Sequence, residues 1–261
     1  MTRPSGSHAS APARLAARSR AASAGLGGIC ALALSEVRIL VRNQLVLATA
    51  LLLPLGLGAL IASDGTDDSW GEVVAMQFVM VLLFCVYATA TTSLAARRRQ
   101  LVLKRLRSGE LSDPQILAGL LAPLLILAAV QSVLLITCAV AFGAPLPEHP
   151  LVLVPAYVFG SVMAASMALA TVAFTASAEL AQITVAPFFL AAITSAAWVL
   201  SAEAGAVTWL MDLTPGGALA DLVRQGWEDG GRLVPPIAGL LVWTGVGYAV
   251  STRWLRWEPR R

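Results

Sequence analysis

Long apolar runs separated by short charged segments constrain this sequence more than any other feature. Six runs lie between the charged residues, at Leu45–Ala62, Val73–Leu94, Ile116–Phe142, Leu151–Thr175, Leu180–Leu200 and Val234–Thr252. About 20 predominantly apolar residues allow a helix to cross the hydrocarbon core of a bilayer. The chain is 57% hydrophobic and only 13% charged, whereas soluble domains carry about 25% charged residues. The sequence therefore predicts an all-α membrane protein with six transmembrane helices.

The distribution of Lys and Arg predicts how these helices are oriented. Positive residues in short loops are retained on the cytoplasmic side of a membrane. With six spans and an inner N-terminus, every Lys and Arg except Arg224 and Arg232 would face the cytoplasm. This count requires a very short turn at Ala176–Glu179, between the fourth and fifth runs. We therefore expect a multi-pass protein of the plasma membrane with both termini in the cytoplasm.

The N-terminal residues differ in composition from the rest of the chain. Residues 1–28 are rich in Ala and Ser, contain four arginines and have no acidic residue. No long apolar core follows before Glu36 and Arg38, which favours a disordered cytoplasmic tail over a cleaved signal. Residues 29–261 would then form the transmembrane domain.

Two segments outside the six runs have the pattern of short amphipathic helices. Ala31–Asn43 alternates apolar residues with Glu36, Arg38 and Arg42, as expected for a helix along the inner membrane surface. On the outer side, Thr214 can cap a helix that has Pro215 in its first turn. Its apolar stripe would consist of Leu219, Leu222, Val223 and Trp227. We expect this second helix to lie on the outer leaflet or to dip into it.

The chemistry of the apolar runs excludes several functions. Their interiors contain no Asp, Glu, Lys, Arg or His, which disfavours an ion-coupled pump, although a carrier that binds Na⁺ through unwound backbone stays open. The two histidines, His8 and His149, and three isolated cysteines form no catalytic or metal-binding pattern. We expect no enzyme activity, no metal and no nucleic-acid partner.

Energy for active transport would have to come from another protein. The sequence has no G-x-x-x-x-G-K-[ST] phosphate-binding loop, and its only lysine is Lys104. This chain is therefore expected to bind no cofactor.

Polar side chains inside the runs have two possible roles. Gln131, Thr137 and Ser161 are candidates for lining a transport pathway. The more common role of such residues is helix packing through interhelical hydrogen bonds.

The loop after the second run is the most informative segment. It reads RRRQLVLKRLRSGELSDPQIL from Arg97 to Leu117, and it is too basic to enter lipid. A solvated anchor that fixes the topology is one interpretation. Leucines interleaved with arginines also favour a second one, a short helix that packs against another protein.

This loop resembles the corresponding segment of the ABC-2 family of transporter permeases, particularly the bacterial drug exporters. The shared core is Leu103-Lys104-Arg105-Leu106-Arg107, followed by Leu111. The sequence departs from the family pattern at four positions, which are Arg97, Gln100, Leu101 and Glu110. The layout agrees from about residue 30 onward: a surface helix, six spans, and an outer amphipathic helix before the last span.

The resemblance implies a role for each of these segments. Arg97–Glu110 would form a coupling helix that contacts a separate ABC ATP-binding subunit, which would carry ATP and Mg²⁺. The contacting residues would be Arg97, Arg98, Arg99, Leu103, Lys104, Arg105, Leu106, Arg107 and Glu110. Ala31–Asn43 would be a connecting helix beside it, and a second permease copy or homologue would complete the pathway.

Three hypotheses for the function follow from the sequence. The leading one is an export permease for a hydrophobic or amphiphilic substrate, such as a drug, an antibiotic or a lipid-like molecule. The second is a stand-alone carrier or channel. The third is a membrane scaffold or an immunity protein.

Overall fold

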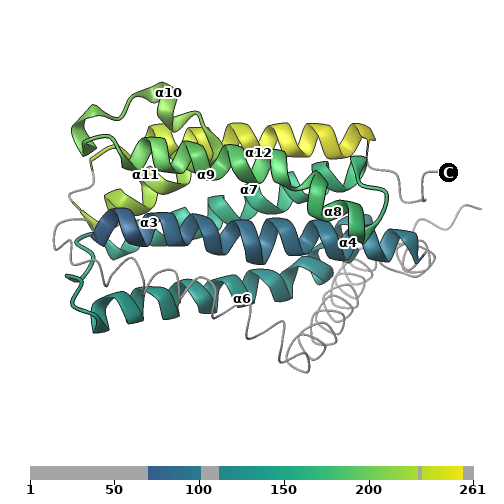
Figure 1. Ribbon diagram of the computed structural model, residues 1–261, viewed down its shortest axis with the longest axis horizontal. Coiled ribbons are helices and arrows are strands. Elements are labelled where there is room, and N and C mark those ends of the chain that lie inside the picture. Colours follow the sequence, from purple (N-terminus) through teal and green to yellow (C-terminus); the bar gives the residue numbers. More distant parts are fainter. Residues whose placement is uncertain (1–69, 101–111, 229–230, 255–261) are drawn as a thin grey trace, which may run out of the picture.

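The described part of the chain is entirely helical. The computed structural model describes residues 70–100, 112–228 and 231–254, and no strand occurs in these ranges (Figure 1). The predicted first span Leu45–Ala62, the tail, the surface helix Ala31–Asn43 and the loop core Leu103–Glu110 lie outside the described residues. An all-α membrane fold is confirmed, whereas the count of six spans stays a prediction.

Twelve helical elements follow one another within the described ranges. They are α3 (Trp70–Val81), the π-helix η1 (Leu82–Ala88), α4 (Thr89–Arg99), α6 (Asp113–Ala141), the 3₁₀ turn η2 (Pro150–Val152), α7 (Leu153–Phe174), α8 (Ala178–Thr184), α9 (Ala186–Leu200), the 3₁₀ turn η3 (Ala204–Ala206), α10 (Trp209–Asp212), α11 (Pro215–Trp227) and α12 (Val234–Trp254).

Five stretches in the described residues are long and apolar enough to cross a membrane. They are Trp70–Arg99, Asp113–Ala141, Pro150–Phe174, Ala178–Leu200 and Val234–Trp254. Each coincides with one of the predicted spans two to six. Helices are the natural solution here because the hydrocarbon core offers no partner for an unpaired backbone group.

The second span is longer than the sequence pattern predicted. The apolar run ends at Leu94, but α4 continues to Arg99, so that Arg97, Arg98 and Arg99 form its last turn. Cations are favourable at a helix C-terminus, where the unpaired carbonyls carry partial negative charge. The three arginines therefore belong to the span and not to the loop that follows it.

The third span begins with a well-defined cap. Ser112 precedes α6, and its backbone N–H donates to Oε1 of Gln115 at 2.9 Å. Together with Pro114 in the first turn, this capping box fixes the point at which the chain re-enters the bundle.

The predicted short turn between the fourth and fifth spans is confirmed. After Phe174 the chain becomes extended at Thr175 and again at Ser177, whose side chain accepts a hydrogen bond from the Leu180 N–H. The fifth span then differs from the prediction of one uninterrupted helix, because α8 and α9 meet at Val185. Pro187 in the first turn of α9 has no N–H, so one intrahelical bond is lost at this point.

The predicted outer helix begins at the expected residue but has a more buried position. Thr214 is the N-cap of α11, Pro215 lies in its first turn, and the whole predicted apolar stripe is buried. All residues of α11 except Gln225 are buried, and the helix packs on α3, α9 and α12. It is therefore an interior element of the bundle at one end, not a helix lying along the membrane surface.

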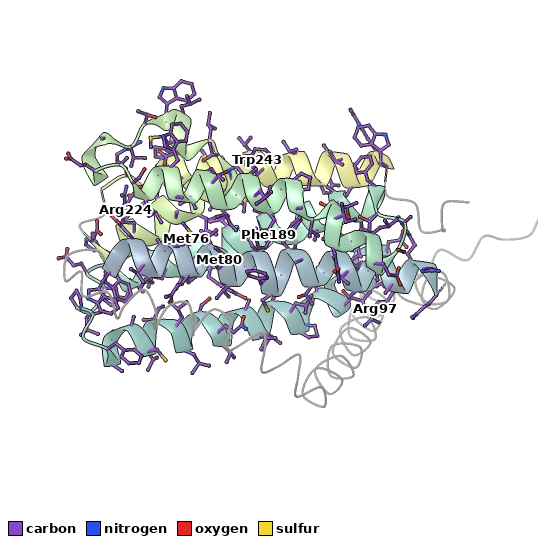
Figure 2. All side chains as sticks on the ribbon, viewed as in Figure 1. Met76, Met80, Arg97, Phe189, Arg224 and Trp243 are labelled. Carbon is purple, nitrogen blue, oxygen red and sulfur yellow. The ribbon has the colours of Figure 1, made fainter. Side chains whose placement is uncertain are left out.

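The ends of the bundle differ in character. At one end α4 finishes at Arg99 close to α8; we call this the arginine end (Figure 1). At the other, which we call the loop end, α10 and α11 lie beside the start of α12. Arg97 and Arg224 mark these opposite ends, with Phe189 and Trp243 between them (Figure 2).

Candidate functional site

The arginine end contains the first candidate site, built on the last turn of α4. Arg98 is only 1% exposed, and its guanidinium donates to the carbonyl oxygen of Val172 at 2.9 Å and to that of Thr175. These carbonyls belong to the end of α7 and to the turn after it, where intrahelical partners run out. The planar guanidinium can satisfy both acceptors at once.

The neighbouring arginines lie differently. Arg99 is exposed and pairs with Glu179 in the first turn of α8, with Nη1 and Oε2 3.3 Å apart. Arg97 is partly exposed. The predicted row of three partner-facing arginines therefore divides. Arg97 and Arg99 lie where a partner can reach them, whereas Arg98 is turned into the bundle.

Further contacts join the second span to the fourth and fifth. The Tyr87 hydroxyl lies 3.0 Å from Oγ1 of Thr171 on α7 and donates to the Val185 carbonyl at 3.3 Å. Oγ1 of Thr175 and Oγ1 of Thr184 are 2.8 Å apart, which connects the turn to the end of α8. The three spans are thus linked by side chains at both ends of α4, through Tyr87 just before it and through Arg98 and Arg99 in its last turn.

The candidate pathway residues occupy two environments. Gln131 and Ser161 are buried, at 3% and 4% exposure, on α6 and α7. Thr137 is exposed on α6, and its hydroxyl donates to the Val133 carbonyl of its own helix at 2.8 Å. The structure therefore does not bring the three side chains onto a single surface of this chain.

The loop end holds a second group of charged residues, within and around α11. Arg224 and Asp221 pair at 3.2 Å with both side chains 3% exposed, and Arg224 also donates to the Ala202 carbonyl at 2.9 Å. Arg232 pairs with Asp212 at 2.9 Å, and the Asp212 side chain is 1% exposed. We call these four residues the loop-end charge cluster.

Two carboxyl groups at the loop end have raised pKa values. Burial, reinforced by the nearby negative charge of Asp221, raises the pKa of Asp212 from 3.8 to about 6, although Arg232 opposes the shift. Burial also raises the pKa of Glu228, against the opposing charge of Arg224. Both groups lie outside the membrane-spanning helices.

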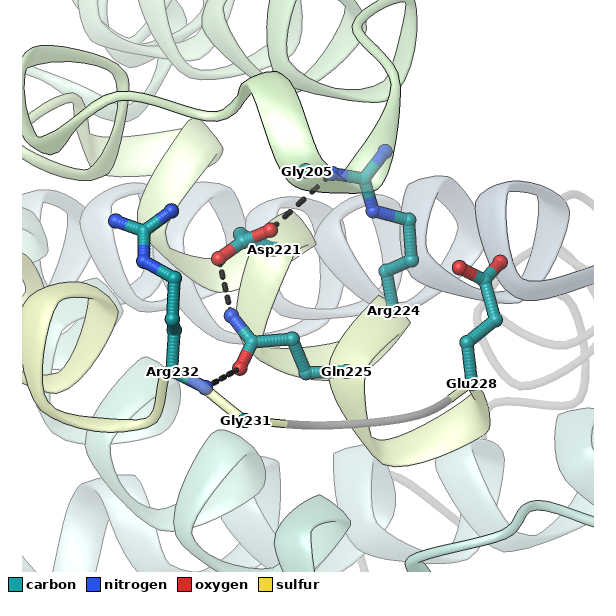
Figure 3. Close-up of a pocket in the computed structure, with 7 residues that line it drawn as sticks. All are labelled: Gly205, Asp221, Arg224, Gln225, Glu228, Gly231 and Arg232. Atoms are coloured by element: carbon teal, nitrogen blue, oxygen red, sulfur yellow. Dashed lines mark hydrogen bonds and ion pairs between the residues drawn. The ribbon is translucent and has the colours of Figure 1, made fainter.

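A small pocket of about 180 Å³ lies beside this cluster (Figure 3). Within it, the backbone N–H of Arg232 donates to Oε1 of Gln225 at 2.9 Å, and the amide nitrogen of Gln225 donates to Asp221. The lining residues are Gly205, Asp221, Arg224, Gln225, Glu228, Gly231 and Arg232. No group of His, Cys, Asp and Glu within the described residues could hold a metal ion.

Sequence reasoning missed the roles of Arg98 and of the loop-end charge cluster. Nothing in the sequence distinguishes Arg98 from its two neighbours, because the difference depends on which side of α4 faces α7. Asp221 and Arg224 did offer a signal, since oppositely charged residues three apart on a helix lie on one face.

Comparison with known proteins gives one match. A family model described as ABC-2 family transporter protein matches residues 44–250. No curated protein and no solved structure matches the chain. The matched segment covers most of the chain, including the loop after span two and every described helix except the last four residues of α12.

Proposed function

The chain belongs to the ABC-2 family of transporter proteins, and from this premise we propose that it is the permease subunit of an ATP-binding-cassette exporter. A separate ABC subunit would hydrolyse ATP, because this sequence has no phosphate-binding loop of its own. A second permease copy or a homologue would complete the transport pathway. The arginine end would face the cytoplasm, together with both termini.

The observation that carries the proposal is the construction of the arginine end. The loop after span two emerges directly from a helix whose last turn contacts both the α7 end and α8. A partner that moves this loop therefore acts on three spans. Arg97 and Arg99, with the predicted loop residues Leu103, Lys104, Arg105, Leu106, Arg107 and Glu110, would form the surface that the ATPase contacts.

The proposed substrate is a hydrophobic or amphiphilic molecule. The spans present apolar side chains outward, among them Ile126, Val133, Leu241 and Val246. A pathway between two such surfaces would favour an apolar cargo over ions or sugars.

The test begins with purification of the tagged chain from its native membranes in mild detergent, followed by identification of co-purified proteins. We expect an ATP-binding subunit, and in liposomes we expect ATP hydrolysis that the amphiphilic dye rhodamine 6G stimulates. Charge reversal at Lys104, Arg105 and Arg107 should abolish stimulation, because guanidinium and ammonium groups would no longer pair with partner carboxylates. Arg253→Glu, at the exposed end of α12, is the matched control.

Two results would contradict the proposal. Uptake driven by an ion gradient without nucleotide would identify a stand-alone carrier. Wild-type behaviour of the charge-reversed variant would favour a scaffold or an immunity protein.

A further inference from the structure

The second and fifth spans each depart from regular α-helix at one place, which we call an interruption, and the two interruptions lie at the same depth in the bundle. In the second span the π-helix η1 ends at Ala88, and in the fifth span α8 gives way to α9 at Val185. The hydrogen bond from the Tyr87 hydroxyl to the Val185 carbonyl places the two interruptions side by side. π-Helical turns and proline breaks are positions where a helix bends most easily.

Toward the arginine end, α4 and α8 are both bonded to the turn that connects α7 to α8. Arg98 holds the carbonyls of Val172 and Thr175, and the hydroxyls of Thr175 and Thr184 are in contact. We call α4, the last turn of α7, the turn at residues 175–177 and α8 the arginine-end unit.

Toward the loop end, the other halves of the same spans belong to a different packing unit. A Cβ on Gly216 would lie 1.7 Å from the Ala192 carbonyl oxygen, so the backbones of α11 and α9 are in direct contact. α11 also packs closely on α3. Span four, by contrast, is the single uninterrupted helix α7, which packs on elements of both ends. The two interruptions therefore separate the packing units only within spans two and five.

We propose that Arg98 is a positioning residue that makes the arginine-end unit move as one body, bending against the loop end at η1 and Val185. The inference rests on the proposed function, in which a partner moves the loop after span two. Arg98 would pass that movement to the turn between spans four and five, and through it to α8. It acts through the carbonyls of Val172 and Thr175 and does not touch the partner or the substrate.

The burial of Arg98 decides which contact transmits the movement. A buried charged donor cannot exchange its carbonyl partners for water, so separating them is costly. The Arg99–Glu179 pair is exposed on both sides, at 64% and 77%, and exposed ion pairs contribute little. Loss of Arg98 should therefore uncouple the unit, whereas loss of Glu179 should not.

A first experiment uses the permease alone, in a variant with its three cysteines replaced. Spin labels at Gln100→Cys and Ile183→Cys report the distance between the exposed ends of α4 and α8. We expect a single narrow distance distribution that broadens in Arg98→Gln and stays narrow in Glu179→Gln. If Arg98→Gln does not fold, Arg98→Lys serves in its place, since an ammonium cannot hold both carbonyls with the geometry of the guanidinium. An unchanged distribution in the Arg98 variant would overturn the inference.

A second experiment uses the complex with its ATP-binding subunit, with and without ATP. The Gln100/Ile183 distance should stay constant, while the distance from Gln100→Cys to a label at Trp198→Cys on α9 should shift. Arg98→Gln should lower transport per ATP hydrolysed by about tenfold, a typical size for coupling between distant sites. Three results would each contradict the inference. They are a nucleotide-dependent change in the Gln100/Ile183 distance, a constant Gln100/Trp198 distance, and unaffected transport in Arg98→Gln.

Failure of the inference can be separated from failure of the proposed function. If no ATP-binding subunit co-purifies, the proposed function is wrong, and the permease-alone distances still decide whether Arg98 joins α4 to α8. If the complex hydrolyses ATP and transports normally with Arg98→Gln, only the inference is wrong.

Discussion

Arg224 and Asp221 illustrate what charge costs in the interior of this protein. Both side chains are 3% exposed, and the two pair with each other. Arg224 also donates to the Ala202 carbonyl, and the amide nitrogen of Gln225 donates to Asp221. Removing two ions from water is expensive, so such a pair is stable only while both members are present.

We predict strongly non-additive effects for this pair. Arg224→Met should lower the stability of the detergent-purified protein by about 3–5 kcal/mol, because it leaves a buried carboxylate uncompensated. The double variant with Asp221→Asn should recover much of that loss. Thermal unfolding of the single and double variants measures the coupling, with exposed Arg253→Met as the control. Simple addition of the two single effects would contradict the prediction.

Asp212 should make stability depend on pH. Its pKa of about 6 in the folded protein exceeds its ordinary value of 3.8, so between these values the folded state binds more protons than the unfolded state. Stability should therefore rise as pH falls from 7 to 5, by about 1 kcal/mol from this group. Glu228 acts in the same direction.

The variant Asp212→Asn isolates this contribution. Its unfolding temperature should change less between pH 7 and pH 5 than that of the wild type. Glu203→Gln, at an exposed position in the same region, should keep the full pH dependence. A pH profile of Asp212→Asn identical to that of the wild type would rule out Asp212 as its source.

At the scale of elements, close backbone contact positions α11 and α12. The nearest atom to a Cβ on Gly216 would be the Ala192 carbonyl oxygen on α9, and for Gly239 it would be the Asp212 carbonyl oxygen at 1.9 Å. Small residues allow such approach between helices in membranes, where packing replaces the hydrophobic effect as the main attraction. These contacts bring the loop-end charge cluster together.

Gly216→Ala should separate α11 from α9. The atom in its way is backbone, which cannot rotate aside, so we expect a loss at the upper end of the usual overpacking range of about 1–3 kcal/mol. Gly245→Ala on α12 meets nothing within 4 Å and should leave the unfolding temperature nearly unchanged. Equal effects of the two alanines on thermal unfolding would argue against close packing at Gly216.

At the scale of the whole molecule, the two ends of the bundle are expected to face different compartments. In a cysteine-free background, a membrane-impermeant maleimide added to intact cells should label Glu203→Cys and not Gln100→Cys, because positive charge near Gln100 favours retention inside. Inside-out vesicles should give the reverse pattern. The same pattern in both preparations would refute the predicted orientation.

Much of the fold could be predicted because membrane helices are specified locally. Apolar length alone located the five spans that the structure describes, and Thr214 and Pro215 marked the start of α11 correctly. The Thr214 hydroxyl, however, donates to the Met211 carbonyl and makes no capping bond to α11. The break at Val185 and the π-helix η1 were not predicted, since both depend on how neighbouring spans pack. The candidate site was predicted in part: the arginines were identified, but not the inward direction of Arg98.

The sequence by itself determined the class of protein. A backbone in lipid must satisfy its hydrogen bonds within each helix, so the local apolar composition decides where the spans lie. It also determined that no nucleotide-binding loop is present and that basic residues gather after span two. Only the tertiary structure decided that Arg98 faces α7 while Arg99 faces α8, and that α11 lies inside the bundle. Those outcomes depend on contacts between residues about 20 to 80 positions apart, such as Arg98 with Thr175 and Arg224 with Ala202.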